Sequence, residues 1–241
     1  MQDNITQFTP DVISGRAKLE KHPINISHET IYKIVYNHAE ILTNYLATKR
    51  KNRKHRKAAS YIDGRGSLVD QRWIDERPES ANNRSRFGHL KVDTIVGKSH
   101  KGAIVSAIDK KSCYAFGGLC KDRKAHTITS NLILQLKKSN RSIRTITADN
   151  GKEFAQHKTL EKYTQAKVYF AHPGCPHQRG QNENFNRILR RYFPKKTDFS
   201  KLDARTVQAA IRKINNTPRK LLNYLTPAEV FNNLKPGAIL F

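Results

Sequence analysis

The chain has 241 residues, with 45 Lys and Arg against 20 Asp and Glu, so its formal net charge is +25. Confining this much like charge in a compact protein costs self-repulsion, which points to a polyanionic partner such as nucleic acid. The sequence has no apolar run of about 18 residues and no apolar core of a signal peptide in residues 1–10, so we expect no membrane span and exclude secreted proteins. It has only three cysteines, which excludes the disulfide-stabilised classes and favours a cytoplasmic protein.

Residues 9–38 are predicted to form two short helices. Thr9-Pro10 is a helix-start signal, and Ser27 caps a second helix with Ile31, Ile34, Val35 and His38 on one side. The pair fits a helix-turn-helix with residues 27–38 as its recognition helix. On pattern alone, an ordinary pair of packed helices fits equally well.

A strongly basic block follows at residues 49–57. Its Lys and Arg residues are Lys49, Arg50, Lys51, Arg53, Lys54, Arg56 and Lys57. Such a block repels itself until a polyanion neutralises it. We favour a clamp on the DNA backbone over a solvated linker, because the rest of the chain is basic as well. Residues 60–86 stay polar and are predicted to be linker.

From Phe87 onward the pattern changes to alternating strands and helices. Strands are expected at 89–96, 102–108, 112–119, 143–148 and 167–171, and helices at 125–138, 151–165, 180–193, 204–215 and 227–233. Short connections make the first three strands an antiparallel meander. The order predicts an α/β fold, a mixed sheet with helices on its faces.

Two carboxylates stand in unusual places. Asp93 lies within the apolar strand 89–96, and Asp149 follows the strand 143–148 just before a tight turn. A carboxylate in a core strand is costly unless it is paired or binds a cation. A salt bridge for Asp93 and a turn-forming role for Asp149 remain the simpler alternatives for each residue alone.

Glu183 is a third candidate, because it opens a helix and lies opposite that helix's apolar stripe, beside Arg187 and Arg190. An ordinary surface pair with Arg187 is the alternative. Three converging carboxylates would suit Mg²⁺, which prefers hard oxygen ligands. Glu153 and Glu161 are possible substitutes for Glu183, with an ordinary position on a helix surface as the simpler alternative for both. A zinc site at Cys175 with His172 and His177 is improbable, since no second ligand pair completes it.

Three motifs together resemble the bacterial DDE transposases of the insertion-sequence-30 family. They are Gly88–Gly97 around Asp93, Thr147–Phe154 around Asp149, and Gln178–Asn184 with Arg190–Lys196 around Glu183. The 33 residues between Asp149 and Glu183 match the spacing of that family's catalytic triad. The strings Ile26–Tyr32, Asn216–Lys220 and Thr226–Glu229 extend the resemblance over nearly the whole chain.

The resemblance implies an RNase H-like five-stranded mixed sheet and cleavage and strand transfer of transposon ends, with Asp93, Asp149 and Glu183 binding Mg²⁺ or Mn²⁺. It implies double-stranded DNA as partner (terminal repeats and target), a homo-oligomer in the synaptic complex, and a place at the bacterial nucleoid. In the helix-turn-helix, DNA contacts are expected from Ser27, His28, Thr30 and Tyr32. Arg179, Arg187, Arg190 and Lys195 are our own candidates for holding phosphates.

The expected organisation is a helix-turn-helix segment at 1–48, a basic linker at 49–86 and a catalytic core with C-terminal helices at 87–241. Two features depart from the family. Leu90-Lys91 stands where many relatives carry Trp-Glu, and relatives usually have a further helix-turn-helix before the first residue of this chain, so the segment 1–48 is expected to be incomplete. A truncated or non-transposing DNA-binding regulator, or a nuclease of the same fold, are the alternatives.

Overall fold

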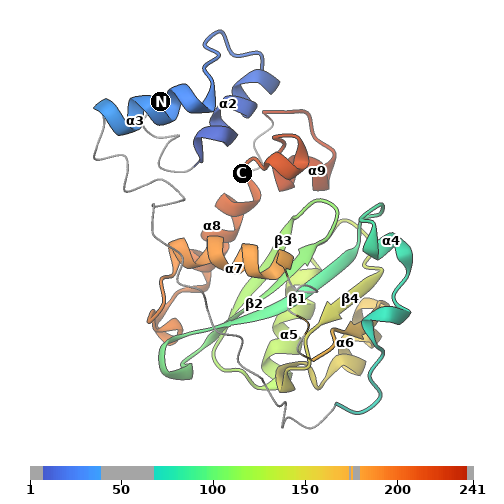
Figure 1. The fold of residues 1–241 in the computed structure, drawn as a ribbon. Helices are drawn as coiled ribbons and strands as arrows, with labels where there is room; N and C mark the ends of the chain where they lie inside the picture. The colour runs from blue at the N-terminus through green and yellow to red at the C-terminus, as the bar shows by residue number, and fades with distance from the viewer. Residues whose placement is uncertain (1–7, 39–67, 174, 176–179, 238–241) are drawn as a thin grey trace. The chain divides into compact units, whose positions relative to one another are not determined.

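The computed structural model describes residues 8–38, 68–173, 175 and 180–237. The chain forms two units, one from Tyr61–Asn215 and one from Met1–Ser60 with Asn216–Phe241, and each is described by itself (Figure 1). The basic block 49–57 lies outside the described residues. None of the described helices is long and apolar enough to cross a membrane.

The first unit is built on a five-stranded sheet. Its strands are β1 (His89–Val96), β2 (Ala103–Asp109), β3 (Ala115–Cys120), β4 (Thr145–Ala148) and β5 (Lys167–Phe170). They lie in the order β3-β2-β1-β4-β5, with β1 to β3 antiparallel and with β4 and β5 parallel to β1. This confirms the expected mixed five-stranded RNase H-like sheet.

Helices cover both faces of this sheet. They are α5 (Ala125–Leu136), α6 (His157–Thr164), α7 (Gly180–Tyr192) and α8 (Ala204–Asn215). Ile95 of β1 packs with Phe185 of α7 and Val207 of α8 in one buried cluster. Val92, three residues earlier and therefore on the opposite face, lines a small cavity with Leu132 of α5. The sheet thus lies between α5 and α6 on one face and α7 and α8 on the other (Figure 1).

Residues 68–86, expected to be linker, pack against the sheet. They contain η2 (Ile74–Glu76) and α4 (Glu79–Asn82). Ile74, Arg77 and Ala81 are buried, and Trp73 forms a β-bridge with Phe170 at the end of β5. The buried residues of this segment are separated by exposed charged ones, and their spacing has neither helical nor strand periodicity.

Two further elements begin three or more residues from their expected start or are divided. The third strand begins at Ala115 rather than 112, because Asp109 accepts hydrogen bonds from the backbone N and the Oγ of Ser112 and closes a turn. The helix expected at 151–165 is split into η4 (Lys152–Phe154) and α6. Short η3 (Lys98–His100) and η6 (Phe199–Lys201) complete the unit.

The second unit contains α2 (Pro10–Leu19), α3 (His28–His38), η7 (Lys220–Leu222) and α9 (Pro227–Asn232). Ile31 and Val35 are buried, with Ile13 and Ile26 packed against them. Ser27 Oγ accepts from Thr30 N at 3.1 Å and caps α3 as expected. Ile34, expected on the same side of the helix as Ile31 and Val35, is 41% exposed.

A buried ion pair joins the two chain segments of this unit. Arg16 of α2 donates to both carboxylate oxygens of Glu229 in α9, at 2.8 and 2.5 Å. Glu229 also accepts from Thr226 N, while Thr226 Oγ1 accepts from Glu229 N, a reciprocal cap at the start of α9. Burial acts to raise the pKa of Glu229, but the bonds from Arg16, Thr226 and Gly237 outweigh it and hold that pKa below its ordinary value.

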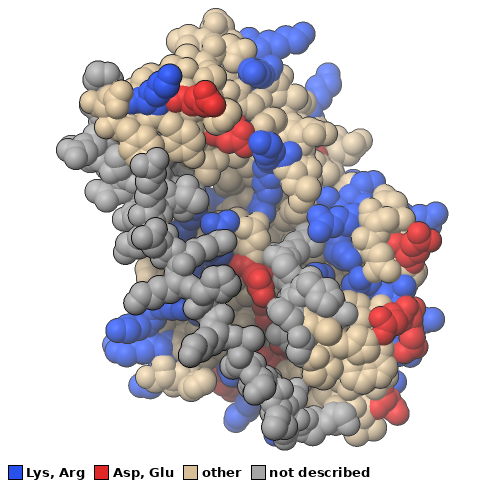
Figure 2. Space-filling view, viewed as in Figure 1, with Lys and Arg blue, Asp and Glu red and all other residues tan. Residues whose placement is uncertain are grey.

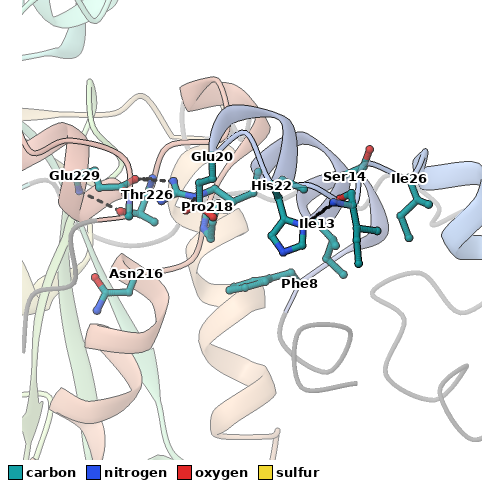
Figure 3. Close-up of a pocket in the computed structure, with 14 residues that line it drawn as sticks. Phe8, Ile13, Ser14, Glu20, His22, Ile26, Asn216, Pro218, Thr226 and Glu229 are labelled. Carbon is teal, nitrogen blue, oxygen red and sulfur yellow. Dashed lines mark hydrogen bonds and ion pairs between the residues drawn. The ribbon is translucent and has the colours of Figure 1, made fainter. Parts of the chain in front are cut away.

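The same segments line a cavity of about 550 Å³. Figure 3 shows Phe8, Ile13 and Ile26 beside it, from the N-terminal segment, and Pro218 and Thr226 from the C-terminal one. The residues after Asn215 therefore group with the N-terminal helices, whereas the sequence motifs alone placed them with the catalytic core.

Candidate active site

Asp93 and Asp149 lie side by side at neighbouring parallel strands. Lys91 of β1 pairs with Thr147 of β4, and the two aspartates each follow two residues later. Because each aspartate lies two residues after a paired residue, both side chains point to the same face of the sheet and lie at the same height along strands about 4.8 Å apart. Both line one small cavity, together with Asn182 of α7.

The carboxylate of Asp93 is oriented from two sides. Asn186 Nδ2 on α7 donates to Asp93 Oδ2 at 2.6 Å, and Thr94 N donates to Asp93 Oδ1 at 2.8 Å. One turn earlier on α7, Asn182 Nδ2 donates to Val92 O at 3.0 Å. Neither asparagine was among the expected site residues, although Asn182, Asn184 and Asn186, at alternate positions around Glu183, are a signal in the sequence.

The loop that carries Asp149 is fixed by its own polar groups. Gly151 N donates to Asp149 Oδ1 at 3.0 Å, so the turn-forming role and the cavity-lining role coexist. Asn150 binds Ala171 O at 3.0 Å and Gln71 Nε2 at 2.8 Å. A Cβ at position 151 would lie 2.9 Å from Asp149 Oδ1, so any other residue there would displace this carboxylate from its observed position.

Glu153 is buried beside this loop and is no surface residue. Its Oε1 accepts from Thr94 Oγ1 and from Arg123 Nη2, each at 2.8 Å, and its Oε2 would lie 2.6 Å from a Cβ on Gly151. Burial acts to raise the pKa of Glu153, but the hydrogen bonds and the charge of Arg123 hold it below its ordinary value. Glu161, the other substitute considered, binds Arg72 and Val168 N and supports β5.

Glu183 lies in the first turn of α7, between Asn182 and Asn186, and its side chain is exposed. Among the described residues no cation stands within salt-bridge distance of it, and Arg187 Nη2 donates to Asn184 instead, at 2.9 Å. The charge of Glu183 does act on Lys91. No three His, Cys, Asp or Glu residues of the described ranges are close enough to hold a metal ion. The structure thus brings two of the three carboxylates together.

The expected DNA contacts divide into several groups. Arg187 and Lys195 are exposed, as are Ser27, His28 and Thr30 at the start of α3. Arg190 is committed to the fold, because its Nη2 donates to Val96 O at 2.8 Å and its guanidinium lies over the Phe199 ring. Tyr32 is half-buried and stacks on Tyr36. Arg179 and the seven residues of the basic block lie outside the described residues, as does His177 of the discounted zinc set.

A cationic cluster that the sequence analysis did not identify lies next to Asp93. We call Arg77, Lys91 and Lys110 the cationic cluster, and their side chains are 8%, 9% and 5% exposed. Burial, with the charges of Arg77 and Arg84, lowers the pKa of Lys91 to about 8. Burial and the same two arginines, with Lys91, lower the pKa of Lys110 to about 7. Figure 2 shows Lys and Arg side chains gathered on the α4 side of the sheet unit.

Three curated proteins are similar to this chain over nearly its whole length. The transposase for insertion sequence element IS4351 of Bacteroides fragilis is 39% identical over 94% of this chain and 70% of its own length. The transposase for IS1086 of Cupriavidus metallidurans is 33% identical over 93% of this chain and 68% of its own length. The transposase InsI for IS30A of Escherichia coli is 31% identical over 93% of this chain and 61% of its own length.

No family model matches the chain. A solved structure, the catalytic core domain of BIV integrase, is 18% identical, with a TM-score of 0.48, and the match covers 60% of this chain and 93% of that one. The sheet order found here and the three transposase relatives agree with the resemblance carried by the motifs around Asp93, Asp149 and Glu183. The chain belongs to the insertion-sequence-30 family of transposases, which are enzymes of the polynucleotidyl transferase type.

Proposed function

We propose that Asp93, Asp149 and Glu183 form the catalytic centre of this transposase and that it cuts the ends of its element and joins them to target DNA. The observation that carries the proposal is the matched position of Asp93 and Asp149 on the parallel strands β1 and β4. Glu183 is included because it lies in the first turn of α7. Asn182 and Asn186 of this helix both bond to β1, which supports a position of that turn beside Asp93.

The donor set suits a divalent cation. Carboxylate oxygens are the hard ligands that Mg²⁺ and Mn²⁺ prefer. The small cavity lined by the two aspartates also has Thr147 and Asn182 in its wall, which carry further side-chain oxygens, and Lys91 lies at the same cavity. Such ions would stabilise the charge that develops on the attacking and leaving oxygens of a phosphoryl transfer. The chain itself orients these carboxylates, through Asn186 and Thr94 at Asp93 and through Gly151 N at Asp149.

Several partners follow from this function. Exposed Arg187 and Lys195 on the α7 side support contacts with DNA phosphates, and exposed Ser27, His28 and Thr30 support contacts from the start of α3. We extend the proposal to the basic block 49–57 as a backbone clamp, to a homo-oligomer that pairs two element ends, and to a location at the nucleoid.

A strand-transfer assay on the element's own terminal repeats tests this function. Asp93→Asn, Asp149→Asn and Glu183→Gln should each lower joining by about 10²–10³-fold, the loss expected when one group that stabilises a transition state is removed. Asp203→Asn, an exposed carboxylate before α8, is the matched control and should join normally.

Other outcomes of the same assay separate the alternatives. Binding of the repeats by the intact chain without cleavage, in Mg²⁺ and in Mn²⁺, would contradict the proposal and favour the DNA-binding regulator. Cleavage without joining would favour a nuclease. Normal joining by Glu183→Gln would remove Glu183 from the catalytic set and leave the two aspartates.

A further inference from the structure

Three cations are buried on the same face of the sheet as Asp93. Lys91 precedes Asp93 by two residues on β1, a step of about 7 Å along the strand. Lys110 N donates to His89 O directly after β2, so Lys110 stands opposite His89 and diagonal to Lys91. Arg77 Nη1 donates at 2.9 Å to Thr147 Oγ1, and Thr147 is the register partner of Lys91.

Two polar neighbours of the cationic cluster, His89 and Asp109, hydrogen-bond to other groups. His89 bonds to Thr145 Oγ1 at 2.9 Å and Ser80 Oγ at 3.0 Å, and burial with the nearby positive charges lowers its pKa, so the ring is neutral at pH 7. The carboxylate of Asp109 accepts from Gly88 N on one oxygen and from Ser112 on the other.

Two donors of the cationic cluster have no acceptor among the described residues. Arg77 Nε is fully buried and makes no hydrogen bond. Within the part of the chain that the structure describes, Lys110 Nζ has no hydrogen-bond or ion-pair partner, and its charged neighbours are Arg77, Lys91 and Arg84. Burying a cation among cations is costly unless an anion joins them. The arrangement therefore indicates an anion that binds here.

We propose that Arg77, Lys91 and Lys110 bind one phosphate group, and that it is a phosphate of the DNA backbone. Along the DNA strand, this phosphate is adjacent to the phosphate held at Asp93. Lysine supplies point charges and arginine a directed donor, which together suit a tetrahedral oxyanion. Lys91 also lines the cavity of Asp93 and Asp149, so the two sites adjoin. The step from Lys91 to Asp93 is close to the separation of successive phosphates along one strand.

The choice of DNA as the source rests on the proposed function, whereas binding of the phosphate group does not. Bound in this site, one backbone phosphate would set the position of its neighbour over the two aspartates. The cationic cluster would then act as a positioning site, with its members contacting the substrate strand away from the reacting atoms.

Thermal unfolding of the full chain, free of metal and DNA, tests the anion site. Sodium phosphate replaces sodium chloride at constant ionic strength. At about four times the dissociation constant, phosphate should raise the Tm of the wild type by about 2–4 °C. Lys110→Met and Lys110→Gln should show no such rise, and Lys162→Met, on the exposed surface of α6, should match the wild type.

Lys110→Met removes a buried charge that has no partner, so its Tm in chloride alone should equal or exceed that of the wild type. A phosphate-dependent rise that persists unchanged in both Lys110 variants, or is absent from the wild type, would overturn the proposal.

A second measurement identifies the source of the phosphate. Terminal-repeat duplexes carrying one uncharged methylphosphonate linkage at successive positions are bound in EDTA. At one position next to the cut site, the methylphosphonate should lower the affinity of the wild type for the duplex. Lys110→Met should bind that duplex and the unmodified one equally. The dependence of log affinity on log salt concentration should be shallower for this variant by about 1. If no position discriminates, the DNA source is wrong and the site takes free phosphate.

The outcome is separable from that of the proposed function. Glu183→Gln should lose joining and keep the phosphate-dependent rise in Tm, because Glu183 belongs to the catalytic centre and not to the cationic cluster.

Discussion

Asp93 has an amide donor from another element aimed at one of its two oxygens. Asn186→Leu keeps the approximate size of the side chain and removes the bond to Asp93 Oδ2. Since groups that orient metal ligands contribute about 10–100-fold to metal affinity, the variant should need about 10-fold more Mg²⁺ for half-maximal joining. A Mg²⁺ titration of strand transfer measures this.

Asn184→Leu is the matched control, because Asn184 is exposed on the same helix and bonds only to Arg187 among the described residues. Equal Mg²⁺ requirements for Asn186→Leu and the wild type would show that this amide does not orient the metal ligand.

Glu153 makes stability depend on pH. Its pKa is lowered in the folded state, so its contribution is complete above the ordinary value of 4.5 and is lost as the pH falls through the folded value. Glu153→Gln should lower the free energy of unfolding by about 1–3 kcal/mol at pH 7 and by less in acid. Urea unfolding at pH 7 and pH 4 measures both values, and a deficit that stays constant between them would contradict the ionic role of Glu153.

At the level of elements, helix side chains hydrogen-bond to the backbone groups on the free edge of the sheet. Among the described strands β3 pairs only with β2, and its outer backbone groups bond to side chains of helices. Gln208 Nε2 donates to Gly117 O at 2.6 Å, and two turns later Asn215 exchanges two bonds with the backbone of Ala115, at 2.8 and 2.9 Å. From the other face, Asn131 Nδ2 donates to Leu119 O at 2.8 Å. The edge thus offers little template for another strand.

Asn215→Leu should therefore destabilise the sheet unit. The change leaves the N–H and C=O of Ala115 buried without partners, and each such group costs about 1–3 kcal/mol, so the loss should be about 2–6 kcal/mol. Denaturant unfolding measures it, with Lys213→Leu, exposed on the same helix, as control. Equal midpoints for the two variants would show that the bonds of Asn215 to Ala115 do not stabilise the sheet unit.

The elements differ in how far the sequence determines them. The strands around Asp93 and Asp149 and the helix of Glu183 are predicted closely, because apolar periodicity is strong there and the turns carry Gly, Asn and Asp. The segment 68–86 could not be predicted, because Ile74, Arg77 and Ala81 are anchors without periodicity. The cationic cluster could not be predicted either, because only the strand register reveals that Lys91, Lys110 and Arg77 share one face.

At the level of the whole molecule, the helical unit depends on an ion pair between distant parts of the chain. Arg16→Met leaves Glu229, which is 1% exposed, buried without its cation. Breaking such a pair costs about 3–5 kcal/mol, enough to remove the protection of α2 amides against hydrogen exchange. Hydrogen exchange of Pro10–Leu19 measures this, and Lys18→Met, exposed on the same helix, should leave protection unchanged.

The pH dependence of this unit follows from the lowered pKa of Glu229. Its stabilising contribution is complete above 4.5 and is lost as the pH falls through the folded value, so wild-type protection of α2 should decline in acid. Arg16→Met should show a weaker decline. An equal decline in both proteins would place the acid sensitivity of α2 elsewhere.

The Arg16–Glu229 pair can form only late in the synthesis of the protein. Its two partners stand 213 positions apart, and a ribosome that adds about 5–20 residues per second needs roughly 10–40 s to travel from one to the other. All of Tyr61–Asn215 has been synthesised before Glu229 is added. A nascent chain can therefore complete its sheet before Glu229, the ion-pair partner of Arg16 in α2, has been synthesised. Translation that stops between Asn215 and Glu229 releases a polypeptide with both aspartates in place and its helical unit unfinished.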